Sequence, residues 1–140
     1  MRVKVKHLQR LCAKHDAQFV LNDKIDLAIE LGCDGLHIGK SDHHRFEEIR
    51  ANFNGFIGVS CSGDVEHAKE FEQKGADCVT FGSFFSSPTK PDSNIVPLEV
   101  IKEAKQKLQI PVCVIGGITI KNLDDILEYK PDMVSVISDI

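Results

Sequence analysis

A lysine and several hydroxyl side chains follow an apolar run in the middle of the chain. The run Cys78–Phe81 is typical of a buried strand, and Gly82 ends it. The polar side chains beyond it are those of Ser86, Ser87, Thr89 and Lys90. Short hydroxyl donors beside a cation suit a phosphate or a similar anion. The same composition is equally typical of a solvated surface loop.

Strands that could position this loop recur along the chain. Three segments share a helix stop, an aspartate, an apolar run and a small residue, namely 31–39, 74–82 and 130–138. Such repetition is typical of helix-to-strand returns. Three further apolar runs end in polar or glycine residues, namely 17–21, 56–59 and 111–115. Continuous apolar runs favour parallel strands that are covered on both faces.

Apolar residues at three- and four-residue spacing predict a helix before each strand. Their apolar positions span 5–12, 25–31, 46–49, 65–71, 98–108 and 123–127, and we expect the third helix to run from about Asp42 to Asn52. Thr119 is a candidate N-cap for the last helix. Arg2, Lys4 and Lys6 alternate with valines and predict the solvent-facing side of the first helix.

Six helix–strand pairs in succession predict a parallel α/β sheet with right-handed connections. Two architectures fit this order, an open doubly wound sheet or a piece of a (β/α)₈ barrel. In a barrel, functional groups gather on the loops that follow the strands. The polar clusters of this sequence all lie at such positions, namely 22–23, 39–42, 60, 86–90, 116–117 and 138.

Composition excludes several classes of partner. The formal net charge of −4 offers no basic surface for nucleic acid. No apolar run approaches the roughly 20 residues that cross a bilayer. Five widely spaced cysteines without a metal-binding pair indicate a reducing cytoplasm. We expect a cytoplasmic domain that covers 1–140, with no nucleic acid and no membrane as partner.

Five segments, taken in order and spacing, resemble the family of thiamine-phosphate synthase and thiazole tautomerase. They are 21–28, 32–42, 57–60, 81–92 and 114–118. The resemblance covers nearly the whole chain and implies a fold of the TIM-barrel (β/α)₈ type. The barrel is expected to be incomplete, a single partial domain over 1–140 with six parallel strands, lacking the first two strands and the last helix.

The resemblance also implies an activity in thiamine biosynthesis. The family is a transferase that couples hydroxymethylpyrimidine diphosphate to hydroxyethylthiazole phosphate and releases diphosphate, with Mg²⁺ as cofactor. By similarity, Asp23 and Asp42 hold the metal. Asn22, Ser60 and Lys90 hold the diphosphate, with Lys90 and Ser60 in the catalytic roles. The thiazole phosphate is implied to bind Ser87, Thr89 and the backbone amides around Gly117, Ile137 and Ser138.

Each of these positions also has a purely structural interpretation. Asn22, Asp23 and Asp42 are residue types that cap helices. Ser60 could simply end a strand, and the glycines 116–117 could form a tight turn. His37 and Cys61 are expected to be partly or wholly buried, and His43–His44 is expected to be a solvated helix start.

Departures from the family pattern leave three functions open. The glutamine, arginine and lysine cluster on the family's second strand has no counterpart near Met1. Six strands with barrel curvature would leave open edges, so we expect either a homo-oligomer, an associated chain that covers them, or a fragment of a longer protein. The candidates are an active synthase, a non-catalytic phosphate-binding remnant and a thiazole tautomerase. The last is less favoured, because such relatives have a histidine where this chain has Ser62.

Overall fold

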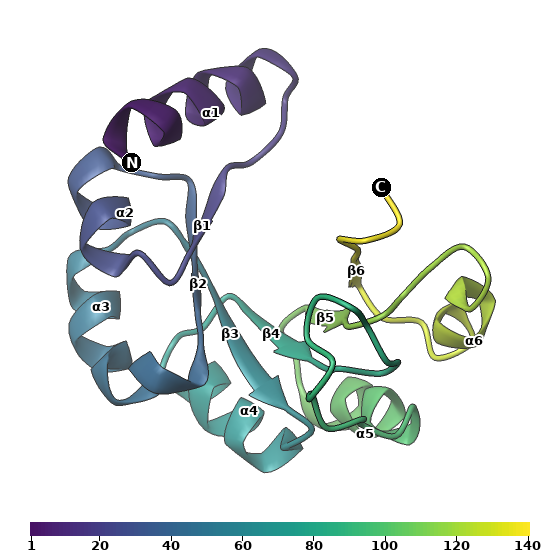
Figure 1. Cartoon of the computed structure of the whole chain (residues 1–140). Helices are drawn as coiled ribbons and strands as arrows, with labels where there is room; N and C mark the ends of the chain where they lie inside the picture. The colour runs from purple at the N-terminus through teal and green to yellow at the C-terminus, as the bar shows by residue number, and fades with distance from the viewer. The chain divides into compact units, whose positions relative to one another are not determined.

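The computed structural model describes all residues, 1–140, and contains six strands alternating with helices (Figure 1). The strands follow chain order in one sheet, and β1 with β2, β4 with β5 and β5 with β6 pair in parallel. The predicted parallel α/β organisation with six strands is confirmed. The chain divides into two compact units, 1–58 and 59–140, which are described in turn.

The first unit contains α1 (Arg2–Lys14), β1 (Val20–Asn22), α2 (Ile25–Leu31), β2 (Gly35–Ile38), the 3₁₀ helix η1 (Lys40–Arg45) and α3 (Phe46–Asn52). Leu36, Ile38, Phe46 and Ile49 are buried and form its core. Val20 pairs with Gly35 and Asn22 with His37. This register places the ends of β1 and β2 side by side.

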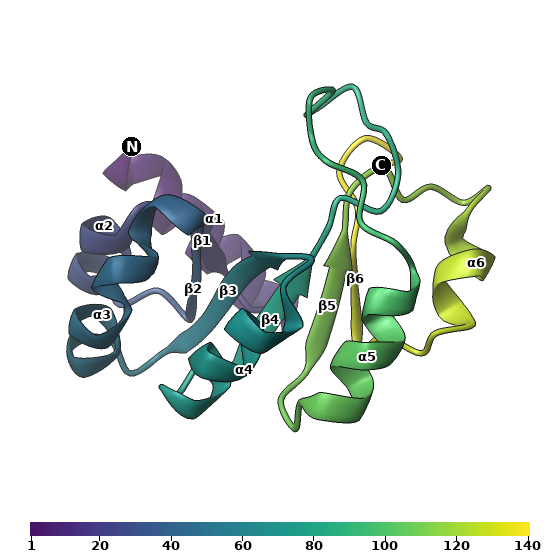
Figure 2. The same cartoon turned by 90° about the horizontal axis from the view of Figure 1, so that it is seen from below.

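The second unit contains β3 (Phe56–Ser62), which begins just before the division, α4 (Val65–Gln73), β4 (Cys78–Phe81), α5 (Glu99–Lys107), β5 (Val112–Ile115), α6 (Leu123–Leu127) and β6 (Met133–Ser135). Every residue of β4 is buried. The helices α4 and α5 cover the same face of β4 and β5 (Figures 1 and 2). In β4 and β5 the continuous apolar runs of the sequence therefore correspond to strands that are covered by helices.

Several predicted boundaries were wrong. The first strand begins at Val20 rather than Ala17, and the Phe19 amide donates to the Asp34 carboxylate (2.9 Å). The strand predicted at 56–59 continues to Ser62, so Ser60 does not end it. The last helix begins at Leu123, with Asn122 at its N-cap position.

Thr119 is not the N-cap of α6 but the start of a preceding turn. The Thr119 amide donates to the Asn122 side-chain oxygen (2.8 Å), and the Thr119 hydroxyl accepts from the Lys121 amide (3.3 Å). Hydroxyl and Asx side chains stabilise such turns as readily as helix starts, so the pattern alone could not separate the two.

None of the helices has the length and apolar composition needed to span a bilayer.

Asp132 connects three elements of the second unit and is expected to make its stability depend on pH. Its carboxylate accepts from Lys105 Nζ (2.7 Å) and from the Val112 amide (2.8 Å). Burial alone would raise the pKa of Asp132, but the hydrogen bonds from Lys105 and Val112 outweigh it, so the pKa is lowered. The stabilisation is therefore full above the pKa of the unfolded carboxyl, near 4, and is lost as the pH falls through the lower folded pKa.

Asp132→Asn should consequently unfold more readily at pH 7 and lose part of the acid sensitivity of the wild type. Urea unfolding at several pH values between 2 and 7 measures this, with the exposed loop residue Asp92→Asn as the matched control. Equal loss of stability with falling pH in Asp132→Asn and wild type would contradict the assignment.

Candidate functional site

Asn22 and Asp23 lie at the carboxyl end of β1. The Asp23 amide donates to the His37 carbonyl at the end of β2 (3.1 Å), and the Asn22 side-chain amide donates to Asp23 Oδ2 (2.6 Å). Asp23 has a φ of 59°, in the left-handed region that aspartate and asparagine tolerate better than most residues. The helix α2 has Lys24 at its N-cap position without a side-chain cap. The capping interpretation of Asp23 is therefore wrong.

Asp42 follows β2 in the same unit. It lies within η1, whose N-cap residue is Gly39, so it does not cap this helix. Its amide donates to the Gly39 carbonyl (3.1 Å), and its carboxylate accepts from the Ser41 hydroxyl (2.9 Å). A Cβ atom on Gly39 would lie 3.0 Å from Asp23 Oδ1. The glycine thus leaves room for the Asp23 carboxylate beside η1.

A cavity of about 260 Å³ brings Asp23 and Asp42 together. Its other lining residues are Lys24, Ile25, Asp26, Leu27 and Arg45. Arg45 was missed in the sequence, although it lies one helical turn after Asp42. Its guanidinium pairs with Glu48 (3.2 Å) and Asp26 (3.5 Å), and the hydrogen bond from Arg45 lowers the pKa of Glu48. Two strand-end carboxylates therefore share a cavity with a cation that already has acidic partners.

The loop that carries Ser87, Thr89 and Lys90 belongs to the second unit. Its base is closed by the Val96 amide, which donates to the Ser83 carbonyl (2.8 Å). The Ser87 hydroxyl accepts from the Thr89 amide (3.2 Å), and the Ser93 amide donates to the Lys90 carbonyl (3.2 Å). Lys90 itself is exposed. The loop thus has internal turns that hold its backbone, with the lysine side chain accessible to a ligand.

Gly117 lies directly against this loop. The Phe84 and Phe85 amides donate to the carbonyls of Ile115 and Gly116 (3.3 and 3.0 Å). Gly117 has a φ of 63°, and a Cβ atom on it would lie 2.4 Å from the Ser86 carbonyl oxygen. Gly116 and Gly117 form a tight turn with positive φ angles, as their structural interpretation predicted. Their lack of side chains also lets the β4–α5 loop pack on the β5–α6 loop.

The segment after β6 reaches the β5–α6 loop as well. The Ile120 amide donates to the Asp139 carboxylate (2.8 Å), and Ile137 and Ser138 are exposed next to Asp139. Asp139 was missed in the sequence, where nothing distinguished it from other surface carboxylates. Three loops of the second unit, those after β4, β5 and β6, therefore meet at their strand ends.

Ser60 and Cys61 lie within β3. Ser60 is half-buried, whereas Cys61 is buried as predicted. Burial, with a smaller contribution from Asp64, raises the pKa of the Cys61 thiol to about 12. A neutral thiol is a poor nucleophile. His37 is half-buried as expected, and the His43–His44 pair lies inside η1 rather than at a helix start.

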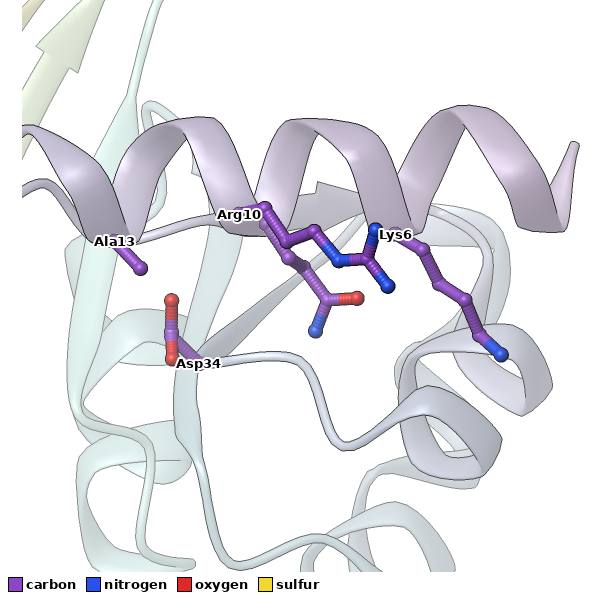
Figure 3. A pocket seen from close by; sticks show the side chains of 5 residues that line it. Lys6, Arg10, Ala13 and Asp34 are labelled. Atoms are coloured by element: carbon purple, nitrogen blue, oxygen red, sulfur yellow. The ribbon is translucent and has the colours of Figure 1, made fainter.

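A second groove, of about 330 Å³, lies beside α1 (Figure 3). Lys6, Gln9, Arg10 and Ala13 line it from α1, and Asp34 lines it from the turn before β2. The Asp34 carboxylate accepts from the Phe19 amide, so it belongs to the amino ends of the strands. None of the site residues predicted from the sequence lines this groove.

The comparisons with known proteins identify the family. A family model described as thiamine monophosphate synthase matches residues 1–140. The chain belongs to this family. Two curated relatives named thiamine-phosphate synthase are 43% identical over 130 residues, from Wolinella succinogenes, and 40% identical over 133 residues, from Thermoplasma acidophilum. The alignments cover 91% and 95% of this chain, but 58% and 62% of those relatives.

A solved structure agrees with the membership of the thiamine monophosphate synthase family. The thiamine phosphate pyrophosphorylase from Pyrococcus furiosus matches with a TM-score of 0.84 and 34% identity, over 98% of this chain and 65% of that one. A mutant tryptophan synthase alpha-subunit from the same organism matches with a TM-score of 0.72 at 16% identity, which shows the fold alone. The TIM-barrel type of fold is thus confirmed, and the chain spans about three fifths of the length of these relatives.

Proposed function

We propose that this chain carries a thiamine-phosphate synthase site, which couples hydroxymethylpyrimidine diphosphate to hydroxyethylthiazole phosphate with release of diphosphate. The observation that carries the proposal is that Asp23 and Asp42 line one cavity at the ends of β1 and β2 in a member of this family. Parallel α/β sheets bind ligands at the carboxyl ends of their strands.

The residues present suit Mg²⁺ as the cofactor. Mg²⁺ prefers oxygen ligands and is commonly held by one or two carboxylates together with substrate phosphates. Asp23 and Asp42 supply such carboxylates, and the Asn22 amide and the Ser41 hydroxyl orient them through the hydrogen bonds at 2.6 and 2.9 Å. When bound, the metal would neutralise charge on the diphosphate oxygens.

The chain's own side chains would stabilise the leaving diphosphate. The negative charge on the leaving group grows as its bond to the pyrimidine methylene breaks, and the Lys90 ammonium group would offset that charge. Asn22 and Ser60 would donate hydrogen bonds to the same group. Since the thiazole nitrogen is the attacking atom, positioning matters more than a strong base.

The three loops that meet in the second unit would hold the thiazole phosphate. Ser87 and Thr89 supply hydroxyls, and the segments around Gly117 and Ile137–Ser138 supply backbone amides. The Ile120 amide, in the same β5–α6 loop, already donates to a carboxylate oxygen of Asp139. This contact joins the β5–α6 loop to the segment after β6, which are two of the three loops that would hold the phosphate.

Binding of inorganic diphosphate tests the metal assignment without requiring turnover. Titration calorimetry with and without MgCl₂ should show Mg²⁺-dependent binding that falls by about tenfold or more in Asp23→Asn and Asp42→Asn. Asp26→Asn is the matched control, because it removes the same charge from the same cavity. An equal loss of diphosphate affinity in all three variants would show that only the total charge of the cavity matters. Unchanged affinity in Asp23→Asn and Asp42→Asn would reject these two residues as metal ligands.

A phosphate-binding protein without turnover is the second candidate, favoured by the meeting of the loops after β4, β5 and β6 within the second unit, which does not involve the two aspartates. An assay with both phosphorylated substrates and MgCl₂ distinguishes the two. Product formation supports the synthase. Diphosphate binding without product supports the second candidate.

A further inference from the structure

Arg45 is a half-buried cation in the cavity that Asp23 and Asp42 line. It ends the 3₁₀ helix η1, three residues after Asp42. A 3₁₀ helix has three residues per turn, so residues three apart lie on the same side of it, about 6 Å apart along the axis. The local geometry of η1 thus explains why Asp42 and Arg45 line the same cavity.

The hydrogen bonds of Arg45 leave part of its guanidinium group available. Nε and Nη2 donate to the Glu48 carboxylate (3.3 and 3.2 Å), and Nη2 also donates to Asp26 (3.5 Å). Nη1 takes part in none of these bonds. A guanidinium group presents five N–H donors in a planar fork that matches the oxygens of a phosphate group. The two donors on Nη1 are therefore available to a ligand.

The acidic partners of Arg45 are weak competitors for it. The side chains of Asp26 and Glu48 are 89% and 63% exposed, whereas that of Arg45 is 30% exposed. Ion pairs with exposed carboxylates contribute little stability, because water and salt screen them. Hydrogen bonds from arginine to phosphate oxygens are charge-assisted and are often bidentate. A phosphate group in the cavity can therefore replace one of these carboxylates with little loss of stability.

Lys24 is the other cation of the cavity and is less suited to this role. Its side chain is exposed, and an ammonium group is a strongly hydrated point charge on a flexible stem. Arg45 is held in place instead, because its bonds to Asp26 in α2 and Glu48 in α3 join two helices that lie side by side (Figures 1 and 2). A cation that is already positioned loses less conformational entropy when it binds a ligand.

We propose that Arg45 binds the diphosphate group of the pyrimidine substrate, exchanging its contact with Asp26 for phosphate oxygens. The inference rests on the proposed function and deepens it, since it assigns a further side chain of the same cavity to the same ligand. Asp23 and Asp42 would hold the metal, and the Arg45 guanidinium would bind the diphosphate directly. Its charge would offset the negative charge that grows on the leaving group.

Titration calorimetry with inorganic diphosphate in MgCl₂ tests the role of Arg45. Arg45→Gln should bind diphosphate about tenfold or more weakly than the wild type, the loss expected when a hydrogen-bonded charge is removed. Arg45→Lys should lie between the two, since lysine keeps the charge without the planar fork. Lys24→Gln removes the other cation of the cavity and serves as the control, with nearly the affinity of the wild type.

Asp26→Asn gives a second readout of opposite sign. Removing this competing carboxylate should strengthen diphosphate binding by about two- to fivefold, the range of an exposed ion pair. The gain should disappear when Asp26→Asn is made in the Arg45→Gln background, because Asp26 then has no arginine to compete for. A purely structural role of the Arg45–Asp26 pair predicts a loss of affinity in Asp26→Asn instead.

The outcomes separate this inference from the proposed function. Circular dichroism melting verifies that each variant is folded. Equal losses in Arg45→Gln and Lys24→Gln would overturn the inference, as would a loss in Asp26→Asn or a gain that persists in the double variant. Unchanged affinity in Arg45→Gln, together with a loss in Asp23→Asn, would overturn it and leave the metal assignment in place. A wild type without Mg²⁺-dependent diphosphate binding would reject the proposed function itself.

Discussion

Replacing Lys90 by alanine is expected to lower turnover by about 100- to 1000-fold, the range seen when one preorganised charge-stabilising group is removed from a site. This expectation rests on the proposed function. The Lys90 side chain is exposed, and its residue enters the loop structure through the backbone carbonyl that accepts from Ser93. The substitution should therefore leave the free energy of unfolding within about 0.5 kcal/mol of the wild type.

Two further variants separate charge from structure in this test. Lys90→Arg keeps the positive charge and should recover much of the turnover or of the Mg²⁺-dependent diphosphate binding. Lys102→Ala removes an exposed lysine from α5 and should change neither. Turnover that is unchanged in Lys90→Ala would reject the role of this lysine, and loss of stability in that variant would point to a structural role instead.

Gly117→Ala is expected to destabilise the second unit by about 3 kcal/mol or more, the sum of a strained left-handed backbone and a steric clash. The clash arises because the new Cβ atom would lie 2.4 Å from the Ser86 carbonyl and 2.6 Å from the Phe85 carbonyl. Both of these atoms are backbone, so neither can move without shifting the loop. The same shift should displace Lys90 and weaken diphosphate binding.

Gly32→Ala is the matched control for this variant. Gly32 also has a positive φ, 57°, but a Cβ atom on it would meet no other atom within 4 Å. It should therefore show only the backbone cost, about 1 to 2 kcal/mol. Urea unfolding measures both variants, and equal losses would show that the packing of the loop on Gly117 contributes nothing to stability.

Much of the architecture could be predicted from local patterns. The strands at 78–81 and 112–115 read as continuous apolar runs because helices cover the sheet there, and continuous runs are the sequence signature of such strands. Helix α4 followed from Val65, Ala68 and Phe71, which are buried at helical spacing. Boundaries were less accurate where side chains such as Asp34 and Asn122 bind backbone amides, since such contacts depend on residues distant in the chain or on turn geometry.

The sequence by itself determined the alternation of helices and strands, the strand-end position of the polar residues other than Ser60, and the family, because each depends on residue type and spacing along the chain. Only the tertiary structure decided that Asp23 and Asp42 line one cavity instead of capping helices, and that the backbone of the β4–α5 loop rests on Gly117. The physical reason is that parallel pairing of β1 with β2, and of β4 with β5, brings together loops that are separated in the chain by whole helices.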